Sequence, residues 1–428
     1  MIPLTPRKGQ PVGADAPPLG SPGTAMRILT ISHLYPPHHL GGYEIACRGV
    51  VERMVARGHE VVVLTSDTHL DGTDEPSSPD RAQVVRTLRT WWDWEAFAPA
   101  NPSLAARVKI ERHNERALRR ALDEFRPDVA SIWSLGFVSW TMPTILERRS
   151  VPIVLTMLDQ WVCTTPELDA WTRLFDRRPW ARPLGAALGL ETRLPSFRSA
   201  RASAASRMIA DEVASDGRWR LPDLAIVPLG VDTDDFPITA AVSRSWSWRL
   251  LYVGRVVASK GVPTLIRAMA ELPTEATLDV VGHAHENQLA EMTELATRCG
   301  VADRVSFGRP TSRADLRERY RRSDLVVFPS EWPEPFGIVP LEAMACGVPV
   351  IATGTGGSGE FLDDAVNCVL FRPGDPQDLA AAARRVAQDA SLRHSITAGG
   401  TETARALTME RFCDGLERIH REAAGMST

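Results

Sequence analysis

Short apolar runs rich in β-branched residues alternate with longer segments of helical periodicity from residue 26 onward. The apolar runs show little alternation of polar and apolar positions, so both faces of the corresponding strands are expected to be buried. Strands of this kind, separated by helices, are typical of a parallel sheet that helices cover on both sides. In the first half of the chain the predicted strands are 27–32, 60–66, 128–133 and 151–157, with helices from Tyr43 and over 104–125.

The same pattern restarts after a polar, turn-rich segment at 229–237 (LGVDTDDFP). Two such arrays predict an α/β fold of two doubly wound, Rossmann-like domains that face a central cleft. We place the first domain at 26–235 and the second at 236–405, and we expect a C-terminal helix within 406–428 to pack back on the first domain. The strands predicted for the second series are 249–253, 277–282, 304–307, 324–328, 348–352 and 368–371.

The first 25 residues contain six prolines and four glycines and no apolar core of the length that a signal peptide needs. We therefore predict a disordered tail over 1–25. Because strand-like sequence begins abruptly at Met26, we also expect translation to start there.

Charge and cysteine spacing exclude several classes of protein. The 428 residues carry 49 basic and 53 acidic side chains, a net charge of -4, which lacks the positive excess that a nucleic-acid partner requires. The closest cysteines, Cys346 and Cys368, are too far apart for a C-x-x-C zinc or redox motif, which favours a reducing compartment and a cytoplasmic protein. The longest apolar stretch, 337–354, contains Glu342 and two prolines, so no membrane span is predicted. No cofactor and no bound metal are expected.

The segment from Pro329 to Gly357 follows a predicted strand and contains the most informative motif. A short helix is expected to begin near Gly337, which leaves backbone amides at its start free to bind a phosphate group. Glu334 and Glu342 would repel phosphate, so their useful role is to accept hydrogen bonds from sugar or ribose hydroxyls. The alternative is that both glutamates only stabilise the helix dipole from an exposed surface. The amides in question belong to Phe336, Gly337 and Ile338.

A second cluster, from Gly254 and Arg255 to Lys260, follows the first predicted strand of the second domain. Its two cations can neutralise negative charge that grows on a departing diphosphate. An exposed basic pair with no function is the alternative.

In the first domain, Gly41 and Gly42 link a strand to a helix and can let the backbone approach a ligand, although an ordinary loop explains them equally well.

A glycine motif at Gly354, Gly356 and Gly359 has the outline of a dinucleotide-binding fingerprint. Only a few residues remain for the crossover helix before the next predicted strand, fewer than such a crossover needs. We therefore do not predict nicotinamide binding.

Taken together, these segments resemble the retaining GT-B glycosyltransferases, specifically glycosyltransferase family 4, over nearly the whole chain from Met26. The most specific likeness is the E-x7-E motif from Glu334 to Glu342, supported by GR and KG at 254–261, RGHEV at 57–61 and the glycine pair at 41–42. The resemblance implies metal-independent transfer from a nucleotide-diphosphate sugar to a hydroxyl acceptor. It also implies that Glu334 and the neighbouring amides meet the donor sugar, that Glu342 meets the ribose, and that Arg255 and Lys260 meet the diphosphate.

The chain departs from the family at one position. Many members carry a His-Asp pair after the fifth strand of the first domain, whereas this chain has Leu158 and Asp159. Leu158 cannot form a hydrogen bond, so either the substrate is unusual there, or catalysis is weakened, or the positional match is shifted. Asp159 remains a candidate for the acceptor side. A catalytically silent sugar-nucleotide-binding protein and a nucleotide-sugar epimerase on the same fold are the alternatives to a transferase.

The segment 171–207 carries eight arginines against Asp176 and Glu191. Arginines interleaved with apolar residues can lie on an anionic membrane surface or bind an anionic acceptor, and ordinary solvated helix faces also carry such runs. The sequence thus leaves open a peripheral contact with the inner face of a membrane, an anionic acceptor and a solvated surface without a partner. The apolar residues of this segment are Trp171, Leu174, Phe175, Trp180 and Leu184.

Overall fold

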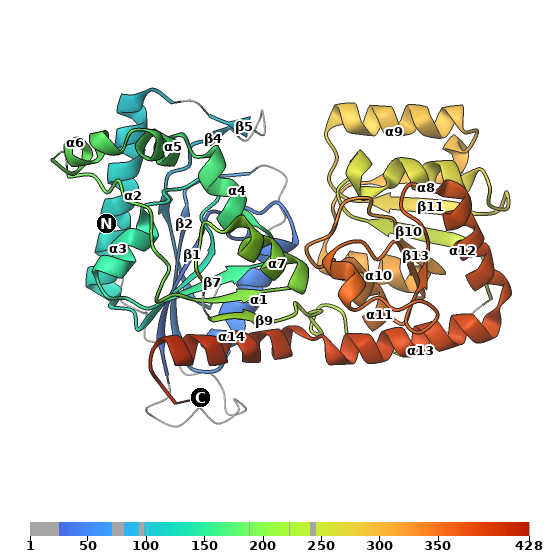
Figure 1. The fold of residues 1–428 in the computed structure, drawn as a ribbon. Coiled ribbons are helices and arrows are strands. Elements are labelled where there is room, and N and C mark those ends of the chain that lie inside the picture. The colour runs from blue at the N-terminus through green and yellow to red at the C-terminus, as the bar shows by residue number, and fades with distance from the viewer. Residues whose placement is uncertain are drawn as a thin grey trace. The chain divides into compact units, whose positions relative to one another are not determined.

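The computed structural model describes residues 25–70, 81–93, 98–100, 102–187, 189–221, 223–239 and 245–427. The predicted N-terminal tail lies outside this part of the chain except for its last residue. The chain divides into two compact units (Figure 1). Unit 1 holds the described residues up to Ala205, 209–227 and the C-terminal residues from Cys413, and unit 2 holds 206–208 and Pro228–Phe412.

Unit 1 is built on a seven-stranded sheet in the order β3-β2-β1-β6-β7-β8-β9, in which all neighbouring strands are parallel. The strands are β1 (Arg27–Ser32), β2 (Glu60–Ser66), β3 (Gln83–Leu88), β6 (Val129–Ser134), β7 (Ile153–Met157), β8 (Arg201–Ala204) and β9 (Asp223–Ile226). A small antiparallel pair joins β4 (Trp92–Asp93) to β5 (Ala98–Pro99). The helices are α1 (Gly42–Ala56), α2 (Leu104–Phe125), α3 (Met142–Arg148), α4 (Trp161–Leu168), α5 (Ala170–Arg177), α6 (Arg182–Ala187) and α7 (Arg207–Asp216).

Unit 2 repeats this plan with a six-stranded parallel sheet in the order β12-β11-β10-β13-β14-β15. In Figure 1 its helices α8 and α9 lie on one side of the strands, and α10 and α11 lie on the other. The two sheets confirm the predicted class of doubly wound, Rossmann-like α/β structure. The strands are β10 (Arg249–Val253), β11 (Thr277–Val281), β12 (Val305–Gly308), β13 (Leu325–Phe328), β14 (Val350–Ala352) and β15 (Val369–Leu370); the helices are α8 (Val262–Met269), α9 (Glu286–Arg298), α10 (Arg313–Arg322), α11 (Val339–Ala345), α12 (Pro376–Gln388) and α13 (Ala390–Ala406).

Side-chain caps fix where several helices begin. The Ser103 hydroxyl accepts a hydrogen bond from the Ala106 amide at the start of α2, and the Asp375 carboxylate accepts one from Asp378 at the start of α12. Each cap satisfies one of the amides that a helix leaves unpaired in its first turn. At the other end of α2, Arg126 adopts a left-handed conformation (φ 52°), which stops the helix and turns the chain toward β6.

The C-terminal helix α14 (Met409–Ala423) explains why the RGHEV motif is built as it is. Within unit 1, Arg57 donates to Glu417 at 2.7 Å, and the Nε2 atom of His59 lies 3.2 Å from the same carboxylate. The His59 contact, aided by the Arg57 and Arg421 guanidinium groups, holds the pKa of Glu417 well below its usual range. The motif therefore ties the end of the chain to the loop between α1 and β2.

No helix among the residues that the structure describes is both long enough and apolar enough to cross a bilayer.

Candidate active site

The candidate site in unit 2 lies where the strand order of the sheet reverses. From β10 the chain moves to β11 on one side, and it later returns to β13 on the other side. The loops that follow β10 and β13 therefore diverge from neighbouring strand ends, which is the place where doubly wound sheets bind ligands. Gly254 and Arg255 follow β10 directly, and Glu334 and Phe336 belong to the loop after β13.

The two loops meet through an ion pair. The ammonium group of Lys260 lies 2.7 Å from Oε1 of Glu334, and both side chains are largely buried. Lys260 ends the short 3-10 helix Ala258–Lys260, which presents its side chain toward the second loop. Arg255 is exposed. Its carbonyl accepts hydrogen bonds from the Tyr252 hydroxyl and the Val257 amide, whereas its guanidinium group makes no hydrogen bond or ion pair with a residue that the structure describes. The structure thus brings Lys260 and Glu334 together and leaves the Arg255 guanidinium available to an anion.

Backbone contacts hold these loops in place. The amides of Glu331 and Trp332 both donate to the Ser259 carbonyl at 3.0 Å. Gly261, which follows Lys260, has φ 72° and lies so close to Pro329 that a β-carbon at this position would be 1.8 Å from the Pro329 carbonyl oxygen. Only glycine combines a left-handed backbone conformation with no side chain, so the close approach of the two loops explains why residue 261 is glycine.

The amides just before α11 have no acceptor among the described residues. Phe336, Gly337 and Ile338 donate no backbone hydrogen bond to any residue that the structure describes. The φ of Gly337 is 86°, and a β-carbon there would lie 2.9 Å from the ring of Phe328. α11 has only seven residues, so its dipole is small and the individual amides are the relevant donors.

Glu342 lies in a separate cluster. Its carboxylate accepts hydrogen bonds from Arg313 at 2.9 Å and from the Tyr320 hydroxyl at 2.8 Å, and the residue is only 2% exposed. Arg313 also donates to Asp235 at 3.1 Å and lies over the ring of Phe236. Within the part of the chain that the structure describes, no hydrogen bond or ion pair joins this cluster to Lys260 or Glu334. The alternative that Glu342 is an exposed surface residue is therefore wrong.

Arg313 and Tyr320 were not singled out from the sequence. Both lie on α10, and Arg313 is separated from Glu342 by 29 positions along the chain. Arg313 is the first residue of α10, after Ser312, whose hydroxyl accepts a hydrogen bond from the Asp315 amide. The sequence around Arg313 therefore shows a helix start and no sign of a buried partner. Only the packing of α10 against α11 reveals the pair.

Removing Arg313 is expected to destabilise unit 2. In Arg313→Met the buried Glu342 carboxylate keeps only its hydrogen bond from the Tyr320 hydroxyl. We therefore expect the unfolding free energy to fall by about 2 kcal/mol. This value is lower than for a fully buried ion pair, because Arg313 is partly exposed. Urea denaturation of Arg313→Met, Glu342→Gln and the double variant measures the coupling. Strictly additive losses would show that the pair contributes no interaction energy.

The glycine pair in unit 1 lies at the start of α1, after β1. Gly41 has an extended backbone (φ 175°) that any residue can adopt, and no atom of the described residues lies within 4 Å of a β-carbon built there. The fold of unit 1 therefore does not require glycine at position 41. Open space beside Gly41 is consistent with close approach of a ligand. Gly42 is exposed and begins the helix.

Asp159 follows β7, as expected, and is partly buried. Its Oδ1 atom accepts a hydrogen bond from the Trp161 amide at 3.0 Å, and burial raises the pKa of its carboxyl to about 6. Leu158 is buried and its amide lies 3.4 Å from the Tyr43 hydroxyl. Position 158 thus presents no polar side chain.

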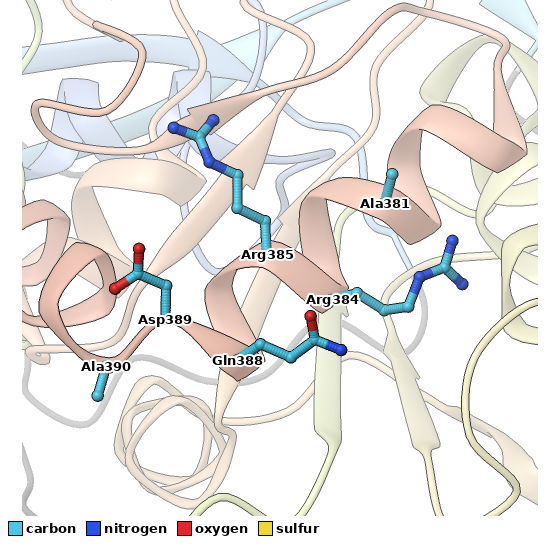
Figure 2. Close-up of a pocket in the computed structure, with 6 residues that line it drawn as sticks. All are labelled: Ala381, Arg384, Arg385, Gln388, Asp389 and Ala390. Atoms are coloured by element: carbon cyan, nitrogen blue, oxygen red, sulfur yellow. The ribbon is translucent and has the colours of Figure 1, made fainter.

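Two other features do not contribute to this site. Between β14 and β15, the glycine motif at 354–359 is followed only by the four-residue 3-10 helix Gly357–Glu360, not by a crossover helix. A shallow hollow of about 530 Å³ lies where α12 ends and α13 begins (Figure 2). Figure 2 shows its two guanidinium groups, Arg384 and Arg385, pointing in different directions, and Arg384 donates to the Glu271 carbonyl, so the hollow does not concentrate positive charge.

No group of three or more histidine, cysteine, aspartate or glutamate side chains that could hold a metal ion occurs among the described residues.

Two family models match the chain. Residues 40–235 match Glycosyltransferase Family 4, and residues 242–403 match Glycosyl transferases group 1. Both matches agree with the family that the E-x7-E and glycine motifs indicate.

Known proteins are similar over most of the chain. An uncharacterized glycosyltransferase of Methanocaldococcus jannaschii is 25% identical, covering 87% of this chain and 91% of that protein. A glycogen synthase of Mycobacterium tuberculosis is 28% identical, covering 85% of this chain and 86% of its own length. The structure of Anabaena HepE in complex with UDP and glucose has the same fold, with a TM-score of 0.66 at 19% identity and coverage of 92% of this chain and 98% of that one. The chain therefore belongs to glycosyltransferase family 4 and is a GT-B enzyme that transfers a sugar from a nucleotide sugar.

Proposed function

We propose that this enzyme transfers a hexose to an acceptor hydroxyl with retention of the anomeric configuration and without a bound metal, and that the loops after β10 and β13 bind its donor. The observation that carries the proposal is the Lys260–Glu334 pair at the point where the strand order of unit 2 reverses. A cation for the diphosphate and a carboxylate for sugar hydroxyls are thereby placed side by side. Binding of UDP and glucose by HepE supports a uridine nucleotide as the first donor to test.

Each polar group receives a distinct role in this proposal. As the bond between the anomeric carbon and the diphosphate oxygen lengthens, Lys260, Arg255 and the amides of residues 336–338 stabilise the growing negative charge. Glu334 accepts hydrogen bonds from the donor sugar and holds Lys260 in place. Glu342 accepts from ribose hydroxyls with the lone pairs that Arg313 and Tyr320 leave open. The acceptor hydroxyl attacks from the face that the diphosphate leaves, and its proton passes to the departing diphosphate oxygen.

A thermal-shift panel of UDP-, GDP-, ADP- and dTDP-sugars tests donor binding. A ligand that binds only the folded chain raises its unfolding midpoint, so one nucleotide class is expected to shift the midpoint far more than the others. An identical midpoint with all four classes would contradict the proposal.

One specific observation, Leu158, favours a second candidate. A chain with no hydrogen-bonding side chain at this position can bind a sugar nucleotide and transfer nothing. An NMR time course with the donor alone, and then with a panel of sugar acceptors, distinguishes the candidates. An epimerase consumes donor without an acceptor, a silent binder consumes none under either condition, and a transferase depends on the acceptor.

We further propose that the arginine-rich segment of unit 1 contacts an anionic membrane surface. Trp171 and Phe175 do not take part, because they are buried in a small cluster with Leu190. Trp180 remains 69% exposed, next to the exposed Arg177 and Arg178. The guanidinium groups of both arginines have no partner among the residues that the structure describes. An exposed tryptophan beside two such arginines has the chemistry of a peripheral membrane contact.

Vesicle flotation tests this contact. Each arginine near an anionic surface contributes about 1 kcal/mol, so Arg177→Ser/Arg178→Ser is expected to weaken binding to phosphatidylglycerol vesicles roughly 30-fold. The double variant Arg405→Ser/Arg411→Ser, on exposed positions of unit 2, serves as the charge-matched control. Equal flotation of the wild type on anionic and on pure phosphatidylcholine vesicles would rule out the electrostatic contact.

A further inference from the structure

His33 lies at the carboxyl end of β1, which lies between β2 and β6 in the sheet of unit 1. It follows β1 directly, its amide donates to the Ser134 carbonyl at the end of β6, and its ring packs edge-on against Phe137. The order of strands in this sheet reverses between β1 and β6, so His33 stands at the position where a doubly wound unit binds a ligand. The residue is only 7% exposed.

Neither ring nitrogen of His33 has a hydrogen-bond partner in the described chain. The Nδ1 atom is buried without a partner, and Nε2 lies 3.6 Å from Oε1 of Glu44, which is beyond hydrogen-bonding distance. A buried imidazole without partners is unusual, because unpaired buried polar groups are costly. The less costly tautomer leaves the lone pair on Nδ1 and places the proton on Nε2, facing Glu44.

Glu44 is buried at the start of α1, where it uses one carboxylate oxygen, Oε2, to accept hydrogen bonds from backbone amides. Its Oε2 atom accepts hydrogen bonds from the Gly41 amide at 3.2 Å and the Leu40 amide at 3.3 Å, which fixes the glycine loop at the start of α1. Oε1 faces Nε2 of His33 and accepts no hydrogen bond from another residue that the structure describes. The Nε2–H group of His33 and Oε1 of Glu44 lie 3.6 Å apart. One oxygen atom beside them can therefore be within hydrogen-bonding distance of both.

We propose that Nε2 of His33 and Oε1 of Glu44 together bind one hydroxyl group of a polyol acceptor. A hydroxyl both donates and accepts, so it can donate to the Glu44 carboxylate while it accepts from the His33 ring. The proposal rests on the transferase function proposed above and assigns an acceptor contact to unit 1. The imidazole from β1 then supplies the hydrogen-bonding group that Leu158 does not.

The backbone around the pair and the protonation state of His33 support this assignment. Phe137, whose ring packs against His33, has φ 74°, a strained conformation for an aromatic residue of the kind that concentrates at ligand sites. Burial lowers the pKa of His33 to about 4 and raises the pKa of Glu44 to about 7, the latter with a contribution from Asp159. The imidazole is therefore neutral at physiological pH and can donate from Nε2. Glu44 is only partly ionised there, but a hydroxyl can also donate to the carbonyl oxygen of the neutral carboxyl group.

The test uses the full chain, labelled with 15N-histidine, and a panel of neutral polyols comprising glucose, galactose, mannose and myo-inositol. At least one polyol is expected to shift the His33 ring nitrogen resonances. His33→Leu, which fills the space without polar atoms, is expected to raise the dissociation constant of that polyol about tenfold or more. His33→Gln retains an amide donor and should recover much of the affinity.

Two controls separate the possible failures. His394→Gln changes an exposed histidine of unit 2 and should bind the polyol as the wild type does. UDP binding, measured on the same samples, should be equal in all variants and also shows that they are folded. No perturbation of His33 by any polyol, or equal polyol affinity in His33→Leu, would overturn the inference. Absence of nucleotide binding in the wild type would instead refute the proposed function.

Discussion

Lys260→Ala is expected to lower kcat about 100-fold, the scale of losing one group that stabilises charge in the transition state. The ammonium group already lies 2.7 Å from Glu334, with which it forms an ion pair before any donor binds. Because the negative charge on the leaving diphosphate grows only during bond cleavage, the loss should fall on kcat more than on KM for the donor. Lys260→Arg keeps the charge but not its position, so an intermediate kcat is expected.

The measurement is steady-state transfer with the donor that the thermal-shift panel identifies. Lys109→Ala provides a matched control, since Lys109 is an exposed lysine of α2 in unit 1. An unfolding midpoint for Lys260→Ala close to that of the wild type ensures that lost activity does not reflect lost structure. If kcat of Lys260→Ala equals that of the control, Lys260 has no role in charge stabilisation.

Gly261→Ala should reduce the unfolding free energy of unit 2 by about 4 kcal/mol or more, because it combines two costs. A β-carbon at this position would lie 1.8 Å from the Pro329 carbonyl oxygen, which belongs to backbone and cannot simply rotate away. The left-handed φ of 72° adds the usual penalty of a residue with a side chain. The loops after β10 and β13 would have to separate, so nucleotide affinity should fall as well.

Gly300→Ala separates the two costs. Gly300 has nearly the same φ, 68°, but no atom of the described residues lies within 4 Å of its β-carbon position. We expect a loss of only about 1–2 kcal/mol there, from backbone conformation alone. Urea denaturation of both variants measures the difference. Equal losses at the two positions would mean that the close approach of Gly261 to Pro329 does not exist in solution.

The strands that the sequence predicted best are those buried on both faces. Predicted strands 27–32, 60–66 and 249–253 agree with β1, β2 and β10 residue for residue, since a short, mainly apolar run that is buried on both faces leaves little ambiguity. β8 and β9 were missed because each has only four residues, with small or half-exposed side chains (RASA and DLAI). In β3 five of the six residues are only half-buried, so no apolar run marks it.

The sequence likewise predicted only part of the candidate site. Lys260 and Glu334 could be identified separately, because each follows a recognisable strand, and their contact then follows from the adjacency of β10 and β13. The partners of Glu342 could not be identified, since Arg313 and Tyr320 lie on a helix whose contact with α11 no local pattern encodes. The His33–Glu44 pair escaped notice for a similar reason, as its meaning depends on unpaired ring nitrogens that only coordinates reveal.

The most direct test of the account is a crystal structure of the full chain with the nucleoside diphosphate that shifts its unfolding midpoint. We predict that the diphosphate contacts Lys260, Arg255 and the amides of residues 336–338, with the ribose hydroxyls at Glu342. A diphosphate bound in contact with none of these groups would contradict the assignment of the donor site to the loops after β10 and β13.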